Sequence, residues 1–130
     1  MSITNRDIYK NALSIIGERV SDNASDDYEE RTEYILPTFY CTARSIDRQI
    51  RKAEGNTAPS SFNTVRISLD DEFPLSDSFV STAALYLAAM LVIDEDQELS
   101  DAIYDKYCDS LASIAAYASC EPISQKYFFG

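Results

Sequence analysis

Residues 79–93 read FVSTAALYLAAMLVI, the longest apolar stretch of the chain. A helix drawn through this stretch is apolar on nearly every face, which is typical of a helix buried at the centre of a bundle. From Ala83 to Ile93 only Tyr86 interrupts the run, which is too short to span a bilayer. The sequence therefore predicts one central, fully buried helix with the rest of the chain arranged around it, and no membrane association.

The segment that follows predicts a turn and a second long helix. Acidic residues at 94–98 form the turn. The predicted buried face of the helix repeats at helical spacing and consists of Leu99, Ile103, Tyr107, Leu111, Ile114 and Ala118. Pro122 is expected to end the helix, because proline lacks the amide that the next turn needs. Residues 122–130 are therefore predicted to form an extended C-terminal tail.

The segment before the central helix has a different pattern. Residues 55–61 are rich in turn-forming residues, and Val65, Ile67 and Leu69 then alternate with polar residues. Strict alternation predicts a short β-strand or one arm of a hairpin. Residues 75–77, Leu-Ser-Asp, are predicted to start the central helix as a hydrophobic staple and cap.

Two further helices are predicted in the N-terminal half. Thr4 and Asp7 have the spacing of a short capping box, and Gly17 is a natural end for the first helix. The second helix is expected to run from Ser25 to Gly55 as a single helix, bent at Pro37. The resulting fold class is mainly α: a bundle of about four helices over residues 1–121, with a loop or β insertion at 55–75 and a separate tail at 122–130.

Composition fits one domain and argues against most enzymes. The chain has 130 residues, a net charge of −11 and no histidine, so the commonest general base and zinc ligand are missing. The acidic turn resembles a calcium loop only loosely, because Leu99 stands where the sharp-turn glycine belongs and Asp105 at the twelfth position, where a bidentate glutamate belongs. No pocket is predicted around the acidic pairs at 70–72. We expect no enzymatic activity, no cofactor and no metal.

Charge and cysteine usage also indicate the surroundings of the protein. A chain this acidic repels phosphate backbones, so nucleic-acid binding through a broad basic surface is not expected. The three cysteines, Cys41, Cys108 and Cys120, form no CxxC pair, and the odd count is typical of reduced thiols in a cytosolic protein. The first residues lack the basic-then-apolar pattern of a signal peptide.

Two charged rows are the first candidate sites. Arg44, Arg48 and Arg51 recur at helical spacing on the second helix, and Asp101, Asp105 and Asp109 recur every four residues on the last helix. Each row is predicted to point away from the apolar face of its helix. Both rows are consistent with solvated faces. Alternatively, the basic row of one subunit docks on the acidic row of the next, a heterologous contact that builds rings.

The aromatic C-terminus is the second candidate site. Tyr127, Phe128 and Phe129 stand together at the chain end, close to Ile123. One interpretation is that these side chains fold back onto the core of the protein. The other is that the tail adds a strand to a partner or fills its pockets.

Three stretches together resemble the head–tail connector proteins of tailed bacteriophages, also called adaptor or head-completion proteins. The first is IYKNALSIIGE at 8–18, and the second is FPL at 73–75 followed by AALYLAA at 83–89. The third is YDKY at 104–107, followed by further helix and Pro122-Ile123. The resemblance covers residues 8–127 and rests on the order of these hydrophobic patterns. The loop at 55–65 has no counterpart in it.

The resemblance implies a structural virion protein without enzymatic activity at the head–tail junction. Such proteins form a ring beneath the portal protein, usually with its twelve-fold symmetry. The ring extends the DNA channel and is the docking place for a stopper or tail protein. By this analogy Ile123, Tyr127, Phe128 and Phe129 contact the portal. The row formed by Asp101, Asp105 and Asp109 faces either the neighbouring subunit or the lumen, where DNA would pass without specific binding. Assembly would take place in the bacterial cytoplasm.

Three other interpretations stay open. A tail-terminator type of completion protein has a similar size but more β-strand. A small helical regulator would bind a cytosolic partner protein through the aromatic tail. An enzyme that uses carboxylates alone would need two close carboxylates with separated pKa values in one pocket.

Overall fold

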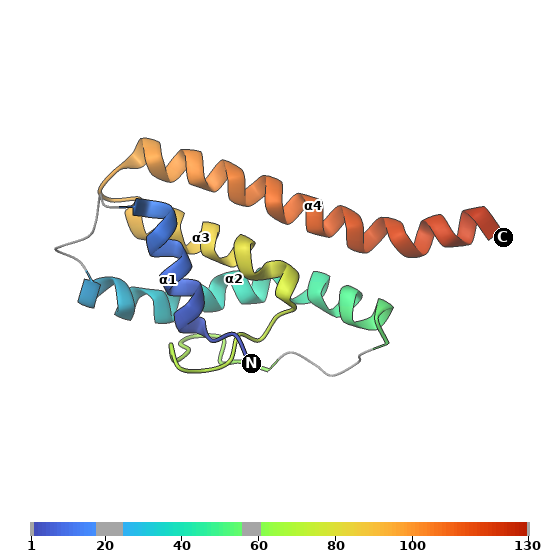
Figure 1. The fold of residues 1–130 in the computed structure, drawn as a ribbon, viewed down its shortest axis with the longest axis horizontal. Coiled ribbons are helices and arrows are strands. Elements are labelled where there is room, and N and C mark those ends of the chain that lie inside the picture. Colours follow the sequence, from blue (N-terminus) through green and yellow to red (C-terminus); the bar gives the residue numbers. More distant parts are fainter. Residues whose placement is uncertain (1, 18–24, 56–60, 130) are drawn as a thin grey trace.

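The computed structural model describes residues 2–17, 25–55 and 61–129, with only the backbone described for 25, 26 and 119–129. The regular secondary structure of these residues consists of α-helices and short 3-10 turns, joined by loops, and includes no strand. The helices are α1 (Asn5–Ile16), α2 (Ser25–Ala53), α3 (Val80–Val92) and α4 (Gln97–Phe129), and the turn is η2 (Asp77–Phe79). The predicted mainly helical fold class is confirmed (Figure 1).

Helix α3 is the central element, as its sequence predicts. It contacts α1, α2 and α4, and it runs in the direction opposite to α2 and α4 (Figure 1). Its side chains are buried on several faces, including the fully buried Leu87 and Leu91. The buried Thr82 hydroxyl lies 2.6 Å from the Ser110 hydroxyl of α4. A helix covered by three neighbours needs apolar residues all round, which explains the composition of this stretch.

Helix α1 begins and ends at the residues that the sequence predicts. The Thr4 hydroxyl accepts from the Asp7 amide, and the Asp7 carboxylate accepts from the Thr4 amide, so the capping box is complete. The hydrogen bonds to this carboxylate lower the pKa of Asp7. Gly17 ends the helix with a φ of 74°, a conformation that favours glycine.

Helix α2 continues through Pro37 as one helix, as expected. Proline at this position cannot donate to the Glu33 carbonyl one turn earlier. The Ile67 amide of the following segment donates to that carbonyl instead, at 3.0 Å. The proline therefore leaves the Glu33 carbonyl free on the side of α2, and the segment at 61–76 is attached to α2 through it.

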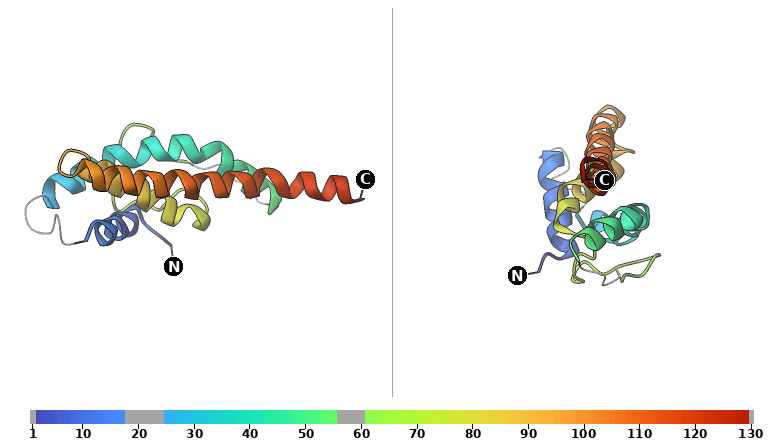
Figure 2. Two further views of the ribbon diagram at one scale, coloured as in Figure 1. Left: turned by 90° about the horizontal axis from the view of Figure 1, so that it is seen from above. Right: turned by 90° about the vertical axis from the view of Figure 1, so that its right-hand side faces the viewer.

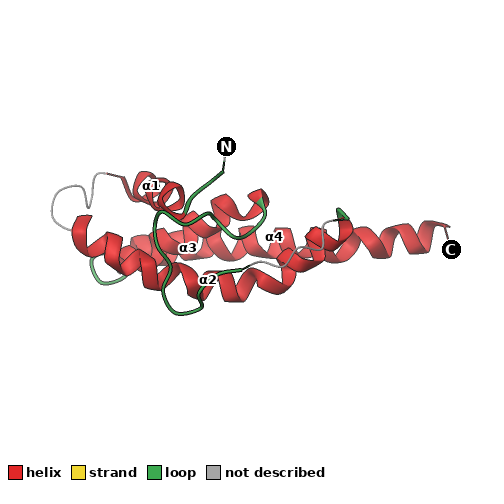
Figure 3. Cartoon of the chain, turned by 90° about the horizontal axis from the view of Figure 1, so that it is seen from below, coloured by secondary structure: helices red, strands yellow, loops and turns green. Residues whose placement is uncertain are grey.

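The strand predicted around residues 65–69 is wrong. Figure 3 shows the described part of this segment as a loop. Its regular pairing is limited to an isolated bridge between Thr4 and Glu72. Ile67 and Leu69 are buried, as the alternation suggested, whereas Val65 is 68% exposed. The alternation therefore reflects an extended segment that packs on helices with one side covered. It does not reflect a β-sheet.

The same segment supplies carbonyls to the start of α1. The first amides of a helix have no partner inside it. The Asn5 amide donates to the Asp71 carbonyl at 2.9 Å, and the Arg6 amide donates to the Leu69 carbonyl at 2.8 Å. The backbone of the loop is thus bonded to α1 and α2 in place of a neighbouring strand.

The start of the central helix also differs from its prediction. Ser76 precedes η2, but its side chain does not cap the turn. Its hydroxyl donates instead to the carboxylate of Asp47 in α2, at 2.6 Å. The serine therefore ties two elements together, through a charge-assisted hydrogen bond in which its hydroxyl is the donor.

Helix α4 is longer than expected. Asp96 caps it through the Leu99 amide, at 3.0 Å, and the helix continues through Pro122 to Phe129. Residues 122–129 form a tail that projects beyond the bundle, as expected, but their backbone is helical (Figures 1 and 2). A proline inside a helix removes one hydrogen bond and bends the helix without always ending it.

Candidate interaction surface

The acidic row lies on the outer side of α4. Asp101, Asp105 and Asp109 are all exposed, and the buried residues Ile103 and Tyr107 lie on the opposite side of the helix. None of the ion pairs among the described residues includes these three aspartates. Exposed Glu98 and Ala112 fall on the same side at helical spacing. We call Glu98, Asp101, Asp105, Asp109 and Ala112 the outer α4 face.

The predicted basic row does not point outward as a unit. Arg48 is exposed, whereas Arg44 is half-buried, with its guanidinium 4.5 Å from the centre of the Phe62 ring. Arg51 is also half-buried and belongs to an internal ion pair. The prediction that Arg51 points outward is therefore wrong.

Asp47 explains the position of Arg51. This carboxylate is fully buried and accepts from Arg51 Nε at 2.7 Å and from the Ser76 amide at 2.9 Å. Arg51 Nη2 donates to the Pro74 carbonyl at 3.0 Å. The two side chains attach the loop before η2 to α2. The i,i+4 spacing of Asp47 and Arg51 was a signal in the sequence for this pair.

Lys52 takes the outward position that was predicted for Arg51. Lys52 is exposed, and it shares a side of α2 with the exposed residues Arg48, Ser45 and Cys41. We call Cys41, Ser45, Arg48 and Lys52 the outer α2 face. Cys108 is a second free, exposed cysteine and lies beside the aspartates of α4.

An aromatic cluster connects the core to the edge of the outer α4 face. The ring centroids of Tyr104 and Tyr107 are 5.2 Å apart, and those of Tyr107 and Tyr86 are 5.0 Å apart. Burial raises the pKa of Tyr107 to about 12 and also raises the pKa of Tyr86. Tyr104, which is 40% exposed, is the outer end of the cluster. Exposed tyrosines of this kind are common in protein interfaces.

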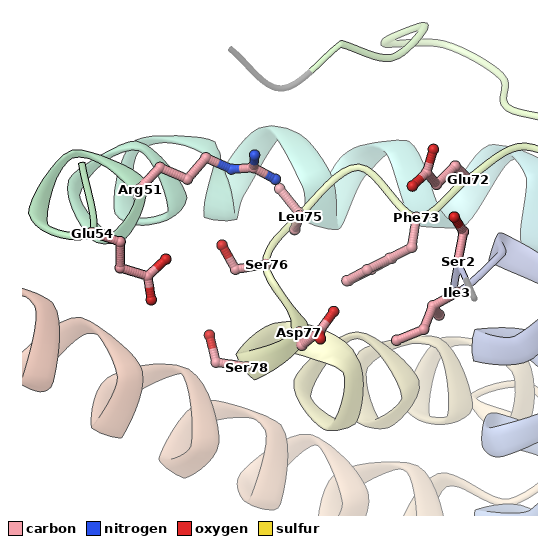
Figure 4. Close-up of a pocket in the computed structure, with 10 residues that line it drawn as sticks. All are labelled: Ser2, Ile3, Arg51, Glu54, Glu72, Phe73, Leu75, Ser76, Asp77 and Ser78. Atoms are coloured by element: carbon pink, nitrogen blue, oxygen red, sulfur yellow. The ribbon is translucent and has the colours of Figure 1, made fainter. Parts of the chain in front are cut away.

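A pocket of about 530 Å³ lies between the N-terminal segment, the end of α2 and the segment before α3 (Figure 4). Glu54, Glu72 and Asp77 contribute carboxylates to its lining, and Phe73 contributes an aromatic ring. The expectation that no pocket lies near residues 70–72 is therefore wrong, because the N-terminal segment and α2 complete its walls. Its cation, Arg51, is bonded to Asp47. The pocket is therefore acidic and suits a cationic group better than a phosphate.

Other kinds of site are limited by what the described residues offer. They contain no group of three or more Cys, Asp or Glu side chains arranged to hold a metal ion. Within the described ranges, every helix is too short or too polar to cross a membrane. The side chains of Ile123, Tyr127, Phe128 and Phe129, predicted to contact a portal, lie outside the described residues, as does that of Cys120.

Comparisons with known proteins identify no relative. The chain matches no family model, no curated protein and no solved structure. The resemblance to head–tail connector proteins therefore stays a prediction from the order of the hydrophobic patterns. The outer faces of α2 and α4 are the surfaces on which predicted site residues are exposed: Arg48 on α2, and Asp101, Asp105 and Asp109 on α4.

Proposed function

We propose that the protein is a structural component of the head–tail junction of a tailed bacteriophage. In this role it forms a ring below the portal protein, with the portal's own symmetry, extends the DNA channel and joins the head to the tail or to a stopper. The proposal combines the resemblance of the hydrophobic patterns with a mainly helical bundle. It names self-assembly and portal binding as the activities of the chain.

The observation that carries the proposal is that helix α4 extends beyond the bundle. The helix has 33 residues, about 50 Å of length, and only its first part lies along the bundle (Figure 1). Buried positions along it thin out after Tyr107: Leu111 and Ile114 are only partly covered, and between residues 108 and 118 only Ala118 is buried. A helix that leaves its own bundle has surface available for a larger assembly.

The charge of the outer α4 face is compatible with this role. Binding of DNA depends on cations that neutralise phosphates. The exposed side of α4 carries Asp101, Asp105 and Asp109, so it would not hold a duplex that passes along it. In the proposed ring this face either lines the lumen or covers a neighbouring subunit.

The portal contact is assigned to the projecting end of α4. Ile123, Tyr127, Phe128 and Phe129 provide apolar and aromatic side chains at the chain end. Aromatic residues contribute strongly to protein interfaces when a partner covers them. We assign these four residues to portal binding.

A pull-down from phage-infected cells tests the proposal. The bait is the tagged full chain, compared with a version that ends at Cys120, and mass spectrometry identifies the retained proteins. We expect the full chain to retain a portal protein and the shortened chain to lose it. Retention by both baits would leave the role intact and refute the tail assignment. Retention of an unrelated host protein alone would refute the connector role and favour a regulator.

A further inference from the structure

The outer faces of α2 and α4 carry opposite charge at the same spacing. Arg48 and Lys52 are four residues apart on α2, and Asp105 and Asp109 are four residues apart on α4. One turn earlier on each helix stand Arg44 and Asp101, continuing both patterns. Both sets are on the solvent side of their helices, apart from the half-buried Arg44. The chain thus carries its own complement to the acidic face.

The directions of the helices limit how the outer α2 face of one copy can pair with the outer α4 face of another. In Figure 1, α2 and α4 both run from left to right, from blue to green and from orange to red. In a closed ring of many subunits, the small rotation between neighbours leaves helix directions almost unchanged. Helix α2 of one copy would then meet α4 of the next in parallel. A two-fold dimer with its axis perpendicular to the helices would pair them antiparallel.

We propose that the outer α4 face of one copy binds the outer α2 face of a second copy in parallel register. In this register Arg48 lies against Asp105, Lys52 against Asp109, and Arg44 beside Asp101. The inference rests on the ring in the proposed function and names its contact surface. It assigns the aspartates to the neighbouring subunit and not to the lumen.

The occupant is a second copy because opposite charges match at three successive turns of the contact. A repeat of four on both helices keeps successive pairs in step over about 12 Å, since each residue of a helix adds 1.5 Å. The same register places no exposed carboxylate of α4 against another on α2, because the outer α2 face is free of acids. Like charges opposite one another would oppose association.

Disulfide trapping tests the contact and its direction. Cys41 already lies exposed on the outer α2 face. In a background of Cys108→Ser and Cys120→Ser, Glu98→Cys places a thiol opposite Cys41 in the parallel register. Ala112→Cys is the matched variant for the antiparallel register. Positions 98 and 112 are both exposed on α4 and are separated by about 21 Å along the helix.

We expect mild oxidation to give a ladder of multimers with Glu98→Cys and little product with Ala112→Cys. A ladder is expected because each copy in a head-to-tail contact offers one thiol to each neighbour. Adding Arg48→Glu should lower the trapped fraction about tenfold, and Asp105→Arg should restore part of it. Circular dichroism of each variant checks that the helical fold is kept.

Two results would overturn the inference. Dimers trapped only with Ala112→Cys would mean a two-fold, antiparallel contact. No trapping with either variant, while electron microscopy of the same variants shows rings on the portal, would mean that a different surface joins the copies; the proposed function would then stand without this contact. Trapped ladders with no portal binding would have the reverse meaning: the contact would stand and the connector role would fail.

Discussion

At the scale of single residues, Asn5 joins three parts of the fold. It is 1% exposed, and its side-chain amide donates to the Ser68 carbonyl at 2.9 Å. Its side-chain oxygen accepts from the Tyr40 hydroxyl at 2.5 Å. The first residue of α1 is thereby bonded to α2 and to the loop at 61–76. Because buried polar groups are costly without partners, this network favours one position of the loop over others.

Tyr40→Phe tests this network. The substitution removes the hydroxyl and leaves Asn5 Oδ1 buried without its donor from α2. We expect the free energy of unfolding to fall by about 1–3 kcal/mol. Urea denaturation followed by circular dichroism measures the change. Tyr34→Phe is the control, because Tyr34 is 45% exposed and its hydroxyl accepts only a solvent-exposed hydrogen bond, from Arg66 at 3.0 Å. Its expected change is within about 0.5 kcal/mol. Equal losses in the two variants would contradict the role given to Asn5.

At the scale of elements, Pro37 determines how the loop is attached to α2. The proline leaves the Glu33 carbonyl without a helical donor, and the Ile67 amide binds it. A feature that interrupts a helix locally thus becomes a docking point for a segment that is distant in the chain. The Arg66 guanidinium adds an ion pair to the Glu33 carboxylate beside this point.

Pro37→Ala is expected to loosen the loop. The introduced alanine would have an amide that donates to the Glu33 carbonyl and competes with the Ile67 amide. The loss of a hydrogen bond worth about 1 kcal/mol would speed exchange of the Ile67 amide roughly five- to tenfold. Hydrogen exchange followed by NMR measures this rate. The Ser100 amide, bonded to the Asp96 carbonyl at 2.9 Å, is the internal control, because it lies at the start of α4 and makes no bond to the loop. Equal acceleration at both amides would indicate general destabilisation and contradict the local explanation.

Local signals predicted the helices well, and tertiary contacts account for the errors. Thr4, Asp7 and Gly17 mark the ends of α1 by bonds formed within a few residues, so the sequence alone is sufficient there. The alternation near Ile67 predicted burial correctly but not a strand, because the partners of its backbone lie on α1 and α2. Arg51 was predicted to face outward for the same reason: its second acceptor, the Pro74 carbonyl, is distant in sequence.

At the scale of the whole molecule, the net charge opposes the assembly that the two outer faces favour. Each copy carries −11, so two copies repel at long range. The proposed contacts between Arg48 and Asp105 and between Lys52 and Asp109 attract only at short range. Salt separates the two effects, because the Debye length falls from about 30 Å at 0.01 M to about 8 Å at 0.15 M and about 3 Å at 1 M.

Association of the full chain is therefore expected to pass through a maximum as salt increases. Between about 0.01 and 0.15 M, screening removes most of the repulsion between whole copies but leaves close ion pairs, so association strengthens. Towards about 1 M the pairs are screened as well, and association weakens. Sedimentation velocity at the three concentrations measures this. Arg48→Glu replaces one attraction by a repulsion, so its association should be weaker at about 0.15 M and keep rising to about 1 M. A steady rise for the unmodified chain would show that attraction between the two faces does not hold the copies together.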